Sequence, residues 1–535
     1  MKKRQKEVNE RRMKGDKRAK GAKWEWFFLF LIIVIASFLR LYKLRDFQFF
    51  TYDQARDYLI VKKMIVDRKF TLVGPTVLAP GIFLPPFYYY SLIPFLPLFK
   101  FHLLGPDIYT AILGIGAVGI FYLLTRDLFG FKTALLATLF FSLNPYLIQA
   151  SRHAWNPNTI YFFTLLFAFS FERYLIKKRS RYLFLASFAF SWSLNLHYTV
   201  LVFLPLLIFL FYKEYLKDKK NKISNNLLLS GIIFVFFISP LFIFELRHNF
   251  PNFRGFLNFV VKQTDVSSPG YNFLERLKFV FTDLLKMPIT LLMGLNQGHN
   301  LTVNPTHILL FDKVGFEPKL QGGVFISLLM IVWGLILIVK SRSKFFAKMT
   351  FIFLFFGFLI RLVFPPSSFY FYHYTFLFPF VFLFSCLIFE QILSKNPKLF
   401  YPLFFLVLLF SFLLVPVKLK NEIKSEEYFL PADEVIAQDV QLAQKPAIAA
   451  NLSDPYRWDH NGLEYRYFLE TKFHLSLGGW EEEDYRQAQT LYLIAEREMK
   501  DPLLLKGMEM DRFSAKRVVK SWELDDGKVV YRLEK

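Results

Sequence analysis

The 535-residue sequence contains one cysteine, Cys386, which lies in an apolar stretch. A single cysteine excludes disulfide bonds within the chain and a cysteine-rich metal site. Charged residues make up only 20% of the chain, whereas 54% are hydrophobic and 69 are Phe. A water-soluble protein could not bury so many apolar side chains, because roughly a quarter of a typical soluble sequence is charged. The composition therefore indicates a membrane protein.

Acidic residues are scarce before residue 418. Residues 418–535 contain 18 Lys and Arg and 23 Asp and Glu, which leaves 48 basic and 20 acidic residues in 1–417. The basic residues lie at the ends of apolar runs, where they orient membrane helices and meet anionic lipid headgroups. We therefore expect membrane lipids as partners, and no nucleic acid.

The N-terminal segment 1–23 carries 11 Lys and Arg and three acidic residues, which is typical of a cytosolic tail. The apolar run that follows, 24–41, lacks a small-residue cleavage site. We interpret it as a retained first span rather than a signal peptide.

Eleven apolar stretches approach the roughly 20 residues that a helix needs to cross a bilayer. The predicted spans are 24–43, 107–125, 133–149, 159–175, 182–197, 199–212, 226–244, 322–340, 347–364, 374–392 and 399–417. The Lys- and Arg-rich loops all fall on the side of the N-terminal tail if the Pro-rich stretch 83–104 does not cross. We therefore interpret 83–104 as an interfacial or re-entrant segment on the outer side. The sequence predicts a multi-pass plasma-membrane protein with a cytosolic N-terminus and an extracytoplasmic C-terminus.

The predicted domains are the tail 1–23, a membrane domain 24–417 with large outer loops 44–106 and 245–321, and a soluble domain 418–535. In the soluble domain, alternating runs at 517–524 and 528–533 flank Asp526-Gly527, which is a strong hairpin signal. Residues 491–495 are typical of a buried strand, and 433–444 and 463–470 of helices. We expect a small α/β or α+β fold.

The loop after the first span contains an acidic motif. Thr51 and Gln54 have the spacing of a capping box, which predicts that a helix begins here. Asp53 would then lie in the first turn, and Asp57 one turn further on the same face. Acidic residues at this position stabilise a helix N-terminus, and a carboxylate here could equally act as a general base or a metal ligand. Both interpretations stay open at this point.

Arginine and histidine side chains gather at the predicted outer ends of the spans. They are Arg152, His153 and Asn156 after the third span, His197 after the fifth, Arg247 and His248 after the seventh, and Tyr372 and His373 before the tenth. Each alone is typical of the polar belt at a membrane surface. Together with Arg56 and Asp53, they suit a site that binds a phosphate and deprotonates a hydroxyl.

Further motifs lie along the same region. They are Leu84-Pro-Pro-Phe-Tyr-Tyr-Tyr90, Leu104-Gly-Pro106, Arg126-Asp-Leu-Phe-Gly130, Asn144-Pro145, Ser151-Arg152 and Asn156-Pro157. With Asp53 after the first span, their order resembles the GT-C superfamily of membrane glycosyltransferases over roughly residues 24–417. The resemblance is to the branch of protein O-mannosyltransferases and lipid A aminoarabinose transferases, glycosyltransferase family 39.

The resemblance implies an inverting transfer of a hexose or pentose from a polyprenyl-phosphate donor to an acceptor hydroxyl outside the cytosol. The acceptor could be a lipid, a glycan or a protein. Asp53 would activate the acceptor, and Arg152, Arg247 and His248 would be candidates for the lipid phosphate. Many members have Asp-Glu where this chain has Asp53-Gln54. Asp57 could replace the second carboxylate, which leaves a divalent metal as a hypothesis.

Two other classes of function compete with this interpretation. A transporter or flippase usually shows charges or broken helices near mid-membrane, often in repeated halves. Here the spans are nearly free of charge and the polar groups gather at one face, which favours surface chemistry. A membrane scaffold whose C-terminal domain binds partners is the third alternative.

Overall fold

The computed structural model describes residues 23–77, 81–217, 224–258, 272–292, 321–340, 344–363, 371–420, 424–443, 446–451, 461–495, 498–499 and 501–535. The expected cytosolic tail, apart from Lys23, and much of the expected outer loop 245–321 lie outside these residues. The chain forms two compact units. The first, called the membrane unit, combines Met1–Leu44, Phe70–Ser91 and Asp107–Asn421, and the second, called the loop–tail unit, combines Arg45–Lys69, Leu92–Pro106 and Glu422–Lys535.

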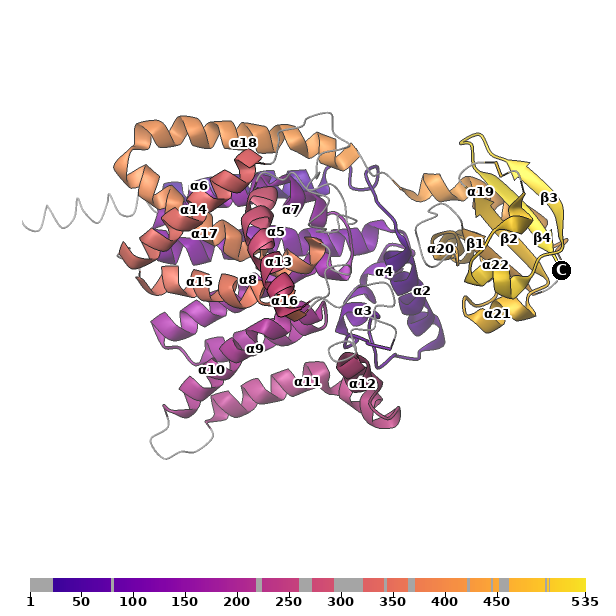
Figure 1. Cartoon of the computed structure of the whole chain (residues 1–535), viewed down its shortest axis with the longest axis horizontal. Helices are drawn as coiled ribbons and strands as arrows, with labels where there is room; N and C mark the ends of the chain where they lie inside the picture. Colours follow the sequence, from indigo (N-terminus) through magenta and orange to yellow (C-terminus); the bar gives the residue numbers. More distant parts are fainter. Residues whose placement is uncertain are drawn as a thin grey trace, which may run out of the picture. The chain divides into compact units, whose positions relative to one another are not determined.

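The membrane unit is built from helices (Figure 1). They are Lys23–Leu41, α3 (Phe87–Leu92), α5 (Leu104–Phe129), α6 (Phe131–Leu143), α7 (Pro145–Ala150), α8 (Asn156–Lys177), α9 (Arg181–Leu194), η1 (Tyr198–Phe203), α10 (Leu204–Tyr215), α11 (Asn225–Arg247), α12 (Pro251–Leu257), α13 (Phe273–Leu292), α14 (Gln321–Lys340), α15 (Lys344–Phe358), α16 (Ile360–Val363), η4 (Phe371–Leu377), α17 (Phe378–Lys395) and α18 (Pro397–Lys420). Every predicted span falls on one or more of these helices.

Within the described residues, seven helices are long and apolar enough to cross a membrane. They are Lys23–Leu41, Leu104–Phe129, Asn156–Lys177, Tyr198–Tyr215, Asn225–Arg247, Phe371–Lys395 and Pro397–Pro416. Shorter apolar helices run over Phe131–Leu143 and Leu328–Leu337. The predicted polytopic helical fold is confirmed, and the number of eleven crossings stays a prediction.

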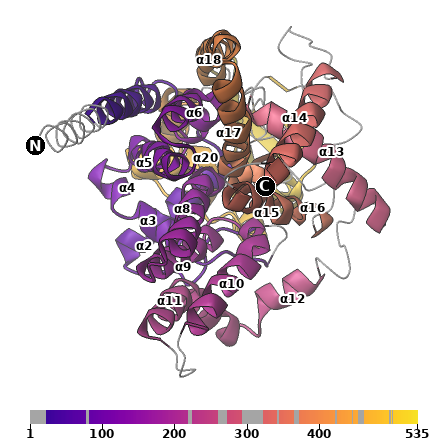
Figure 2. The same cartoon turned by 90° about the vertical axis from the view of Figure 1, so that its left-hand side faces the viewer.

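Phenylalanine rings fill the spaces between the membrane helices. Helices α8 and α9 lie side by side (Figure 2), and the rings of Phe163 and Trp192 stack between them at 5.3 Å. Phe353 of α15 stacks on Phe380 of α17 with a centroid distance of 4.3 Å. Ring packing of this kind adds to the burial of apolar area, which accounts for much of the phenylalanine content.

The predicted span 133–149 is not one helix, and this expectation is wrong. The chain breaks at Asn144, where α6 ends and α7 begins. Pro145 has no N–H to continue the helix, and the Asn144 side chain accepts a hydrogen bond from the Leu147 N–H at 3.1 Å. The Asn144 amide also donates to the Leu291 carbonyl at 2.8 Å, which fixes the break against α13.

The Pro-rich stretch 83–104 forms only short helices, α3 with six residues and α4 (Phe95–Leu98) with four. At 1.5 Å of rise per residue neither can cross a bilayer, which agrees with the prediction that this stretch does not span. Its beginning is held inside the membrane unit. The Phe83 carbonyl accepts hydrogen bonds from Tyr198 at 2.6 Å and from the Asn252 amide at 2.7 Å.

The loop–tail unit contains α2 (Tyr52–Asp67), α4, α19 (Glu426–Asp439), β1 (Ala447–Asn451), α20 (Leu463–Lys472), α21 (Glu482–Gln487), β2 (Thr490–Ala495), η5 (Pro502–Leu504), α22 (Met508–Phe513), β3 (Arg517–Glu523) and β4 (Val529–Glu534). The strands form one sheet in the order β1-β2-β4-β3, in which β1 is parallel to β2 and the other pairs are antiparallel. The predicted β3–β4 hairpin is confirmed, and Gly527 takes the positive φ of 85° that its turn requires. Strand β1 was not predicted, and α19 begins earlier than the expected helix 433–444.

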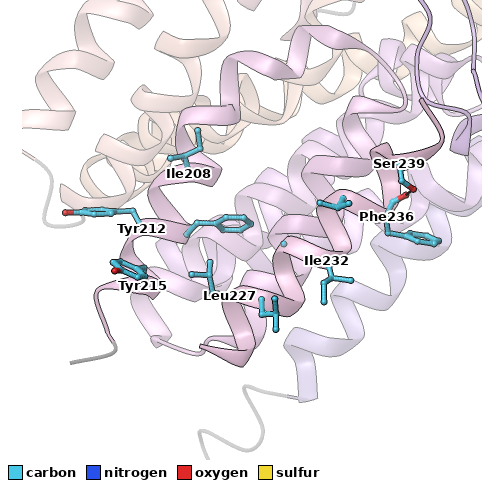
Figure 3. Close-up of a pocket in the computed structure, with 11 residues that line it drawn as sticks. Ile208, Tyr212, Tyr215, Leu227, Ile232, Phe236 and Ser239 are labelled. Atoms are coloured by element: carbon cyan, nitrogen blue, oxygen red, sulfur yellow. Dashed lines mark hydrogen bonds between the residues drawn. The ribbon is translucent and has the colours of Figure 1, made fainter. Parts of the chain in front are cut away.

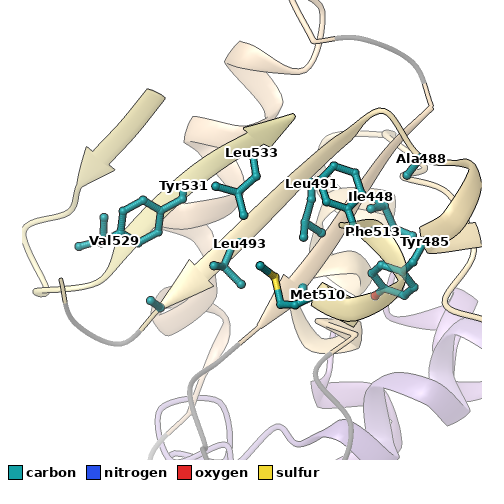
Figure 4. Close-up of a cluster of buried hydrophobic side chains, with 12 residues drawn as sticks. Ile448, Tyr485, Ala488, Leu491, Leu493, Met510, Phe513, Val529, Tyr531 and Leu533 are labelled. Atoms are coloured by element: carbon teal, nitrogen blue, oxygen red, sulfur yellow. The ribbon is translucent and has the colours of Figure 1, made fainter. Parts of the chain in front are cut away.

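One face of this sheet packs on the short helices α21 and α22 (Figure 4). Leu491 and Leu493 of β2 contact Phe513 of α22 and Tyr485 of α21, and Leu533 of β4 extends the same core. These five side chains are buried. The small C-terminal sheet domain expected from the sequence is therefore confirmed.

Candidate functional site

Helix α2 begins at the predicted residue and for the predicted reason. The Thr51 N–H donates to Gln54 Oε1 at 3.1 Å, and the structure has the full capping box. This reciprocal cap satisfies backbone donors that the first turn would otherwise leave unpaired. Asp53 consequently lies in the first turn, near the positive end of the helix dipole.

Arg56 lies between the two carboxylates of the acidic motif. Its Nη1 is 3.0 Å from Asp53 Oδ1, while its Nε and Nη2 donate to Asp57 Oδ1 at 2.9 and 2.8 Å. The Asp57 side chain is 1% exposed, whereas 38% of the Asp53 side chain is exposed. Asp53 is therefore the accessible carboxylate of the two, and Asp57 holds the guanidinium that contacts it.

This arrangement does not suit a metal bridged by Asp53 and Asp57. The Arg56 guanidinium already neutralises both carboxylates from the space between them. Across the described part of the chain, no group of three or more His, Cys, Asp or Glu side chains is placed to hold an ion. Arg56 is therefore the cation beside Asp53.

A second group of predicted residues comes together in the membrane unit, and we call it the histidine cluster. It consists of His153 and Trp155 before α8, His197 before η1, and Tyr372 and His373 in η4. The rings of His197 and His373 lie 5.0 Å apart, and the Tyr372 ring lies 4.6 Å from Trp155. All three histidines are at most 5% exposed. Residues separated by more than 200 positions thus form one packed polar and aromatic group.

One member of the histidine cluster, His197, carries no positive charge. His197 lies after the end of α9 and before the apolar span that begins at Tyr198. Burial lowers the pKa of its imidazole to about 3, so the ring is neutral at physiological pH. Its Nδ1 accepts the Thr199 N–H at 3.2 Å. A neutral ring can offer one hydrogen bond to a sugar hydroxyl but no charge to a phosphate.

Asn156 connects the parts of the chain that carry the cluster. It is 4% exposed and lies at the start of α8, where its amide donates to the Leu196 carbonyl at 2.7 Å. This bond joins the first turn of α8 to the segment just before His197. Asn156 therefore holds these two segments together, and its buried amide is not accessible to a ligand.

Arg152 has a structural role in the geometry observed here. Its guanidinium donates to the carbonyls of Leu39, Tyr42 and Lys43 at 3.1, 2.9 and 3.1 Å, at the C-terminal end of the first helix. Such carbonyls have no partner within their own helix, and a cation there is stabilised by the helix dipole. Burial lowers the pKa of Arg152 to about 10, which still leaves it protonated at neutral pH.

Arg247 and His248 are exposed at the C-terminal end of α11. The His248 ring stacks on Phe244 of its own helix at 4.2 Å. Among the contacts of the described residues, none joins this pair to the histidine cluster. Of the residues predicted for this site, the structure brings together His153, His197, Tyr372 and His373, and their role stays a prediction.

A buried ion pair in the membrane unit was not predicted from the sequence. Arg361 Nε lies 2.9 Å from Asp283 Oδ2, and both side chains are at most 1% exposed. The Tyr374 hydroxyl donates to the same carboxylate oxygen at 2.7 Å. Asp283 lies on α13 within the expected loop 245–321, and Arg361 within a predicted span. The amphipathic spacing of apolar residues over 273–292 is the signal that could have revealed α13.

A cavity of about 900 Å³ lies between α10 and α11 (Figure 3). Its lining is apolar apart from the hydroxyls of Tyr212, Tyr215 and Ser239. It contains none of the predicted site residues. Both helices belong to the apolar spans.

Comparisons with known proteins agree with this architecture. Residues 84–244 match the family model described as dolichyl-phosphate-mannose-protein mannosyltransferase. No curated protein sequence matches the chain. ArnT from Cupriavidus metallidurans, solved bound to undecaprenyl phosphate, has 13% identity and a TM-score of 0.55, with 95% of this chain and 98% of ArnT covered. The oligosaccharyltransferase AglB from Archaeoglobus fulgidus, solved with an inhibitory peptide and a dolichol-phosphate, has 12% identity and a TM-score of 0.50, with coverages of 88% and 69%.

The chain is thus a multi-pass membrane protein with the fold of ArnT and AglB. Within that fold, the stretch from the Pro-rich segment to the end of α11 is similar to the dolichyl-phosphate-mannose-protein mannosyltransferases. The resemblance inferred from the sequence motifs is confirmed.

Proposed function

We propose that this protein transfers a sugar from a polyprenyl-phosphate donor to an acceptor hydroxyl on the outer face of a membrane, with inversion at the sugar carbon. The observation that carries the proposal is the exposed Asp53 carboxylate, held by Arg56 at the start of α2 in a chain with the GT-C fold. ArnT and AglB were both solved with polyprenyl-type lipid phosphates, which supports a lipid-linked donor here.

The proposed step needs one base and one leaving group. Asp53 takes the proton of the acceptor hydroxyl as its oxygen forms a bond to the anomeric carbon of the donor. The bond from that carbon to the phosphate oxygen breaks on the opposite face, and the polyprenyl phosphate leaves with the electron pair. Arg56 fixes the direction of the carboxylate through its contact at 3.0 Å.

A departing phosphate needs cationic hydrogen-bond donors. Arg247 is the exposed arginine among those predicted for this purpose, whereas Arg152 is engaged by three carbonyls. We therefore assign Arg247, with His248, as the stronger candidates for the lipid phosphate. His153, His197, Tyr372 and His373 are assigned to the sugar, because their rings pack together and side chains of these types form hydrogen bonds with hydroxyls.

The alternative of a transporter gains nothing from the comparisons, since the matching structures are transferases. The identity of the sugar, hexose or pentose, and of the acceptor, lipid, glycan or protein, is a matter for assay. The proposed topology places the N-terminus in the cytosol and the C-terminal residues outside it.

Release of radiolabelled sugar from defined polyprenyl-phosphate sugars by the purified full-length protein tests the proposal. Asp53→Asn should lower turnover by about a thousandfold, the typical contribution of general base catalysis. Asp67→Asn is the matched control, because Asp67 is exposed at the other end of the same helix. Equal turnover in the wild type and Asp53→Asn would reject Asp53 as the base. A folded wild type without turnover on any donor would reject the proposed reaction.

A further inference from the structure

Helix α2 packs on residues that follow it by almost 400 positions. The Phe50 ring, just before α2, has its centroid 5.4 Å from those of both Tyr467 and Phe468 on α20. Tyr58, on the second turn of α2, lies 5.7 Å from Tyr467. Phe429 of α19 completes the group at 5.8 Å from Phe50. We call these five residues the aromatic clamp, and each is at most 2% exposed.

Backbone hydrogen bonds tie the entry to α2 to the same C-terminal residues. The Phe50 N–H donates to the Lys424 carbonyl at 3.0 Å, and the Lys424 N–H donates to the Gln48 carbonyl at 2.9 Å. Together they pair Phe49 with Lys424 as one rung of a parallel bridge. The direction of the chain into α2 is therefore fixed by residue 424.

The later part of α2 has its own attachment. Lys62 Nζ lies 2.8 Å from Glu470 Oε2 on α20, with both side chains partly exposed. Asp53 falls between the two attachments along the chain. The bridge at Lys424 thus fixes α2 before its first turn, and the Lys62–Glu470 ion pair fixes its later turns, while the Asp53 carboxylate stays accessible.

We propose that the C-terminal domain positions Asp53. The aromatic clamp holds α2 and the C-terminal residues together as one rigid body, and Tyr467 is the positioning residue. The inference rests on the proposed function for the role of Asp53. A simpler interpretation is that the clamp is only the hydrophobic core of the loop–tail unit. A core residue changes stability alone, whereas a positioning residue changes kcat in protein that is still folded.

The first test compares Tyr467→Ala with Tyr467→Phe in the full-length protein. The Phe variant keeps the ring that contacts Phe50 and Tyr58 and loses only the hydroxyl, which donates to the Phe101 carbonyl at 2.5 Å. We expect kcat to fall about 100-fold in Tyr467→Ala, because a displacement of about 1 Å costs that much, with the KM for the donor unchanged. Tyr467→Phe should stay within about twofold of the wild type. Wild-type kcat in folded Tyr467→Ala would overturn the proposal.

The second test does not depend on the folding of Tyr467→Ala. Paired strands lie about 4.8 Å apart, within the range of a disulfide, so Phe49→Cys with Lys424→Cys should form a bond across the bridge. The native Cys386 is buried in α17. The same protein is assayed oxidised and after reduction. If α2 and the C-terminal domain move as one rigid body, the disulfide restrains nothing further, so we expect equal kcat in the oxidised and reduced protein. Activity that is lost on oxidation and restored by reductant would show that α2 must leave the C-terminal domain, and would overturn the proposal.

A third measurement separates this proposal from the proposed reaction. Hydrogen exchange of the wild type reports the opening free energy of each helix without any turnover. We expect α2 and α20 to exchange with the same opening free energy and the same response to mild denaturant. Exchange of α2 through a separate, lower-energy opening would overturn the rigid body. Joint exchange in a protein that transfers no sugar would reject the reaction and keep the rigid body.

Discussion

Two arginines expected at one site, Arg56 and Arg152, are satisfied in different ways. Arg152 donates to three backbone carbonyls at the end of the first helix and is 3% exposed. Arg56 contacts two carboxylates and keeps one of them at the surface. A guanidinium engaged by carbonyls stabilises a helix end, whereas one shared by carboxylates sets the direction of a charge. The residue type alone did not distinguish these roles; the partners do.

The largest expected effect tests the structural role of Arg152. Arg152→Ala leaves the carbonyls of Leu39, Tyr42 and Lys43 without their charged donor, and a hydrogen bond to a charged group contributes about 1.5–3 kcal/mol. We expect a loss of stability of about 3 kcal/mol or more, measured as the unfolding temperature in detergent. Arg247→Ala is the matched control, because Arg247 is exposed. Its stability should be unchanged, while the KM for the donor should rise about tenfold if it binds the phosphate. A stable Arg152→Ala protein with a raised KM would reverse the two assignments.

The next largest effect tests the role of Arg56 by changing Asp57, its buried partner. Asp57→Asn removes the charge that holds the guanidinium at 2.8 and 2.9 Å. We expect kcat to fall about 10- to 100-fold with little change in KM, because Asp53 loses its fixed direction. Steady-state kinetics of the purified variant give both constants. Unchanged transfer would remove Asp57 from the site altogether.

A smaller effect concerns two carboxylates on α19. Asp433 is fully buried, neither oxygen accepts a hydrogen bond from a described residue, and burial raises its pKa well above 3.8. Asp433 therefore takes up a proton when the chain folds at neutral pH. The free energy of unfolding consequently falls as pH rises. Asp433→Leu should raise the unfolding free energy by about 1–2 kcal/mol at pH 8, and by less near pH 4.

Asp439 on the same helix is the control for that prediction. Its Oδ2 accepts a hydrogen bond from the Tyr492 hydroxyl at 2.8 Å. Asp439→Leu should therefore destabilise the protein under the same conditions. Denaturant unfolding of both variants checks the contrast, and equal shifts in one direction would contradict it.

The smallest effect is a pH dependence from His102. Burial lowers the pKa of this imidazole below 6.5, with Arg45 and Lys472 acting in the same direction and Glu426 opposing them. As pH falls, His102 of the unfolded chain therefore binds its proton before His102 of the folded chain does. The contribution of the neutral His102 to stability is complete above pH 6.5 and declines as pH falls below it. His102→Asn should reduce the loss of unfolding temperature between pH 7.5 and 5.5 by about 2 °C. An equal loss in both proteins would show that other groups control the response.

Local signals in the sequence predicted local structure well. Apolar runs located the spans because lipid demands a continuous helix, and the Thr51–Gln54 spacing located the start of α2. Asp526-Gly527 located the hairpin, since few other pairs adopt its turn. The break at Asn144 was also readable, because Pro145 cannot continue a helix. Strand β1 was missed, since its Ala-rich sequence has little strand preference.

Long-range partners explain what the sequence did not predict. The role of Arg152 depends on carbonyls more than 100 residues away, and backbone carbonyls carry no sequence signature. The aromatic clamp joins Phe50 to Tyr467, yet both are ordinary aromatics in a chain with 69 Phe and 27 Tyr. The predicted boundary at residue 418 placed α2 with the membrane domain, whereas its packing partners lie in the C-terminal domain.

The attachment of α2 to α20 also sets an order of events during synthesis. Lys62 and Glu470 are 408 positions apart. At about 5–20 residues per second, the second residue leaves the ribosome about 20–80 s after the first. Through that interval α2 lacks the α20 surface that it packs on, and a ribosome that stops early releases a chain in which α2 never gains these contacts. The packing of α2 on α20 thus becomes a property of the finished chain only.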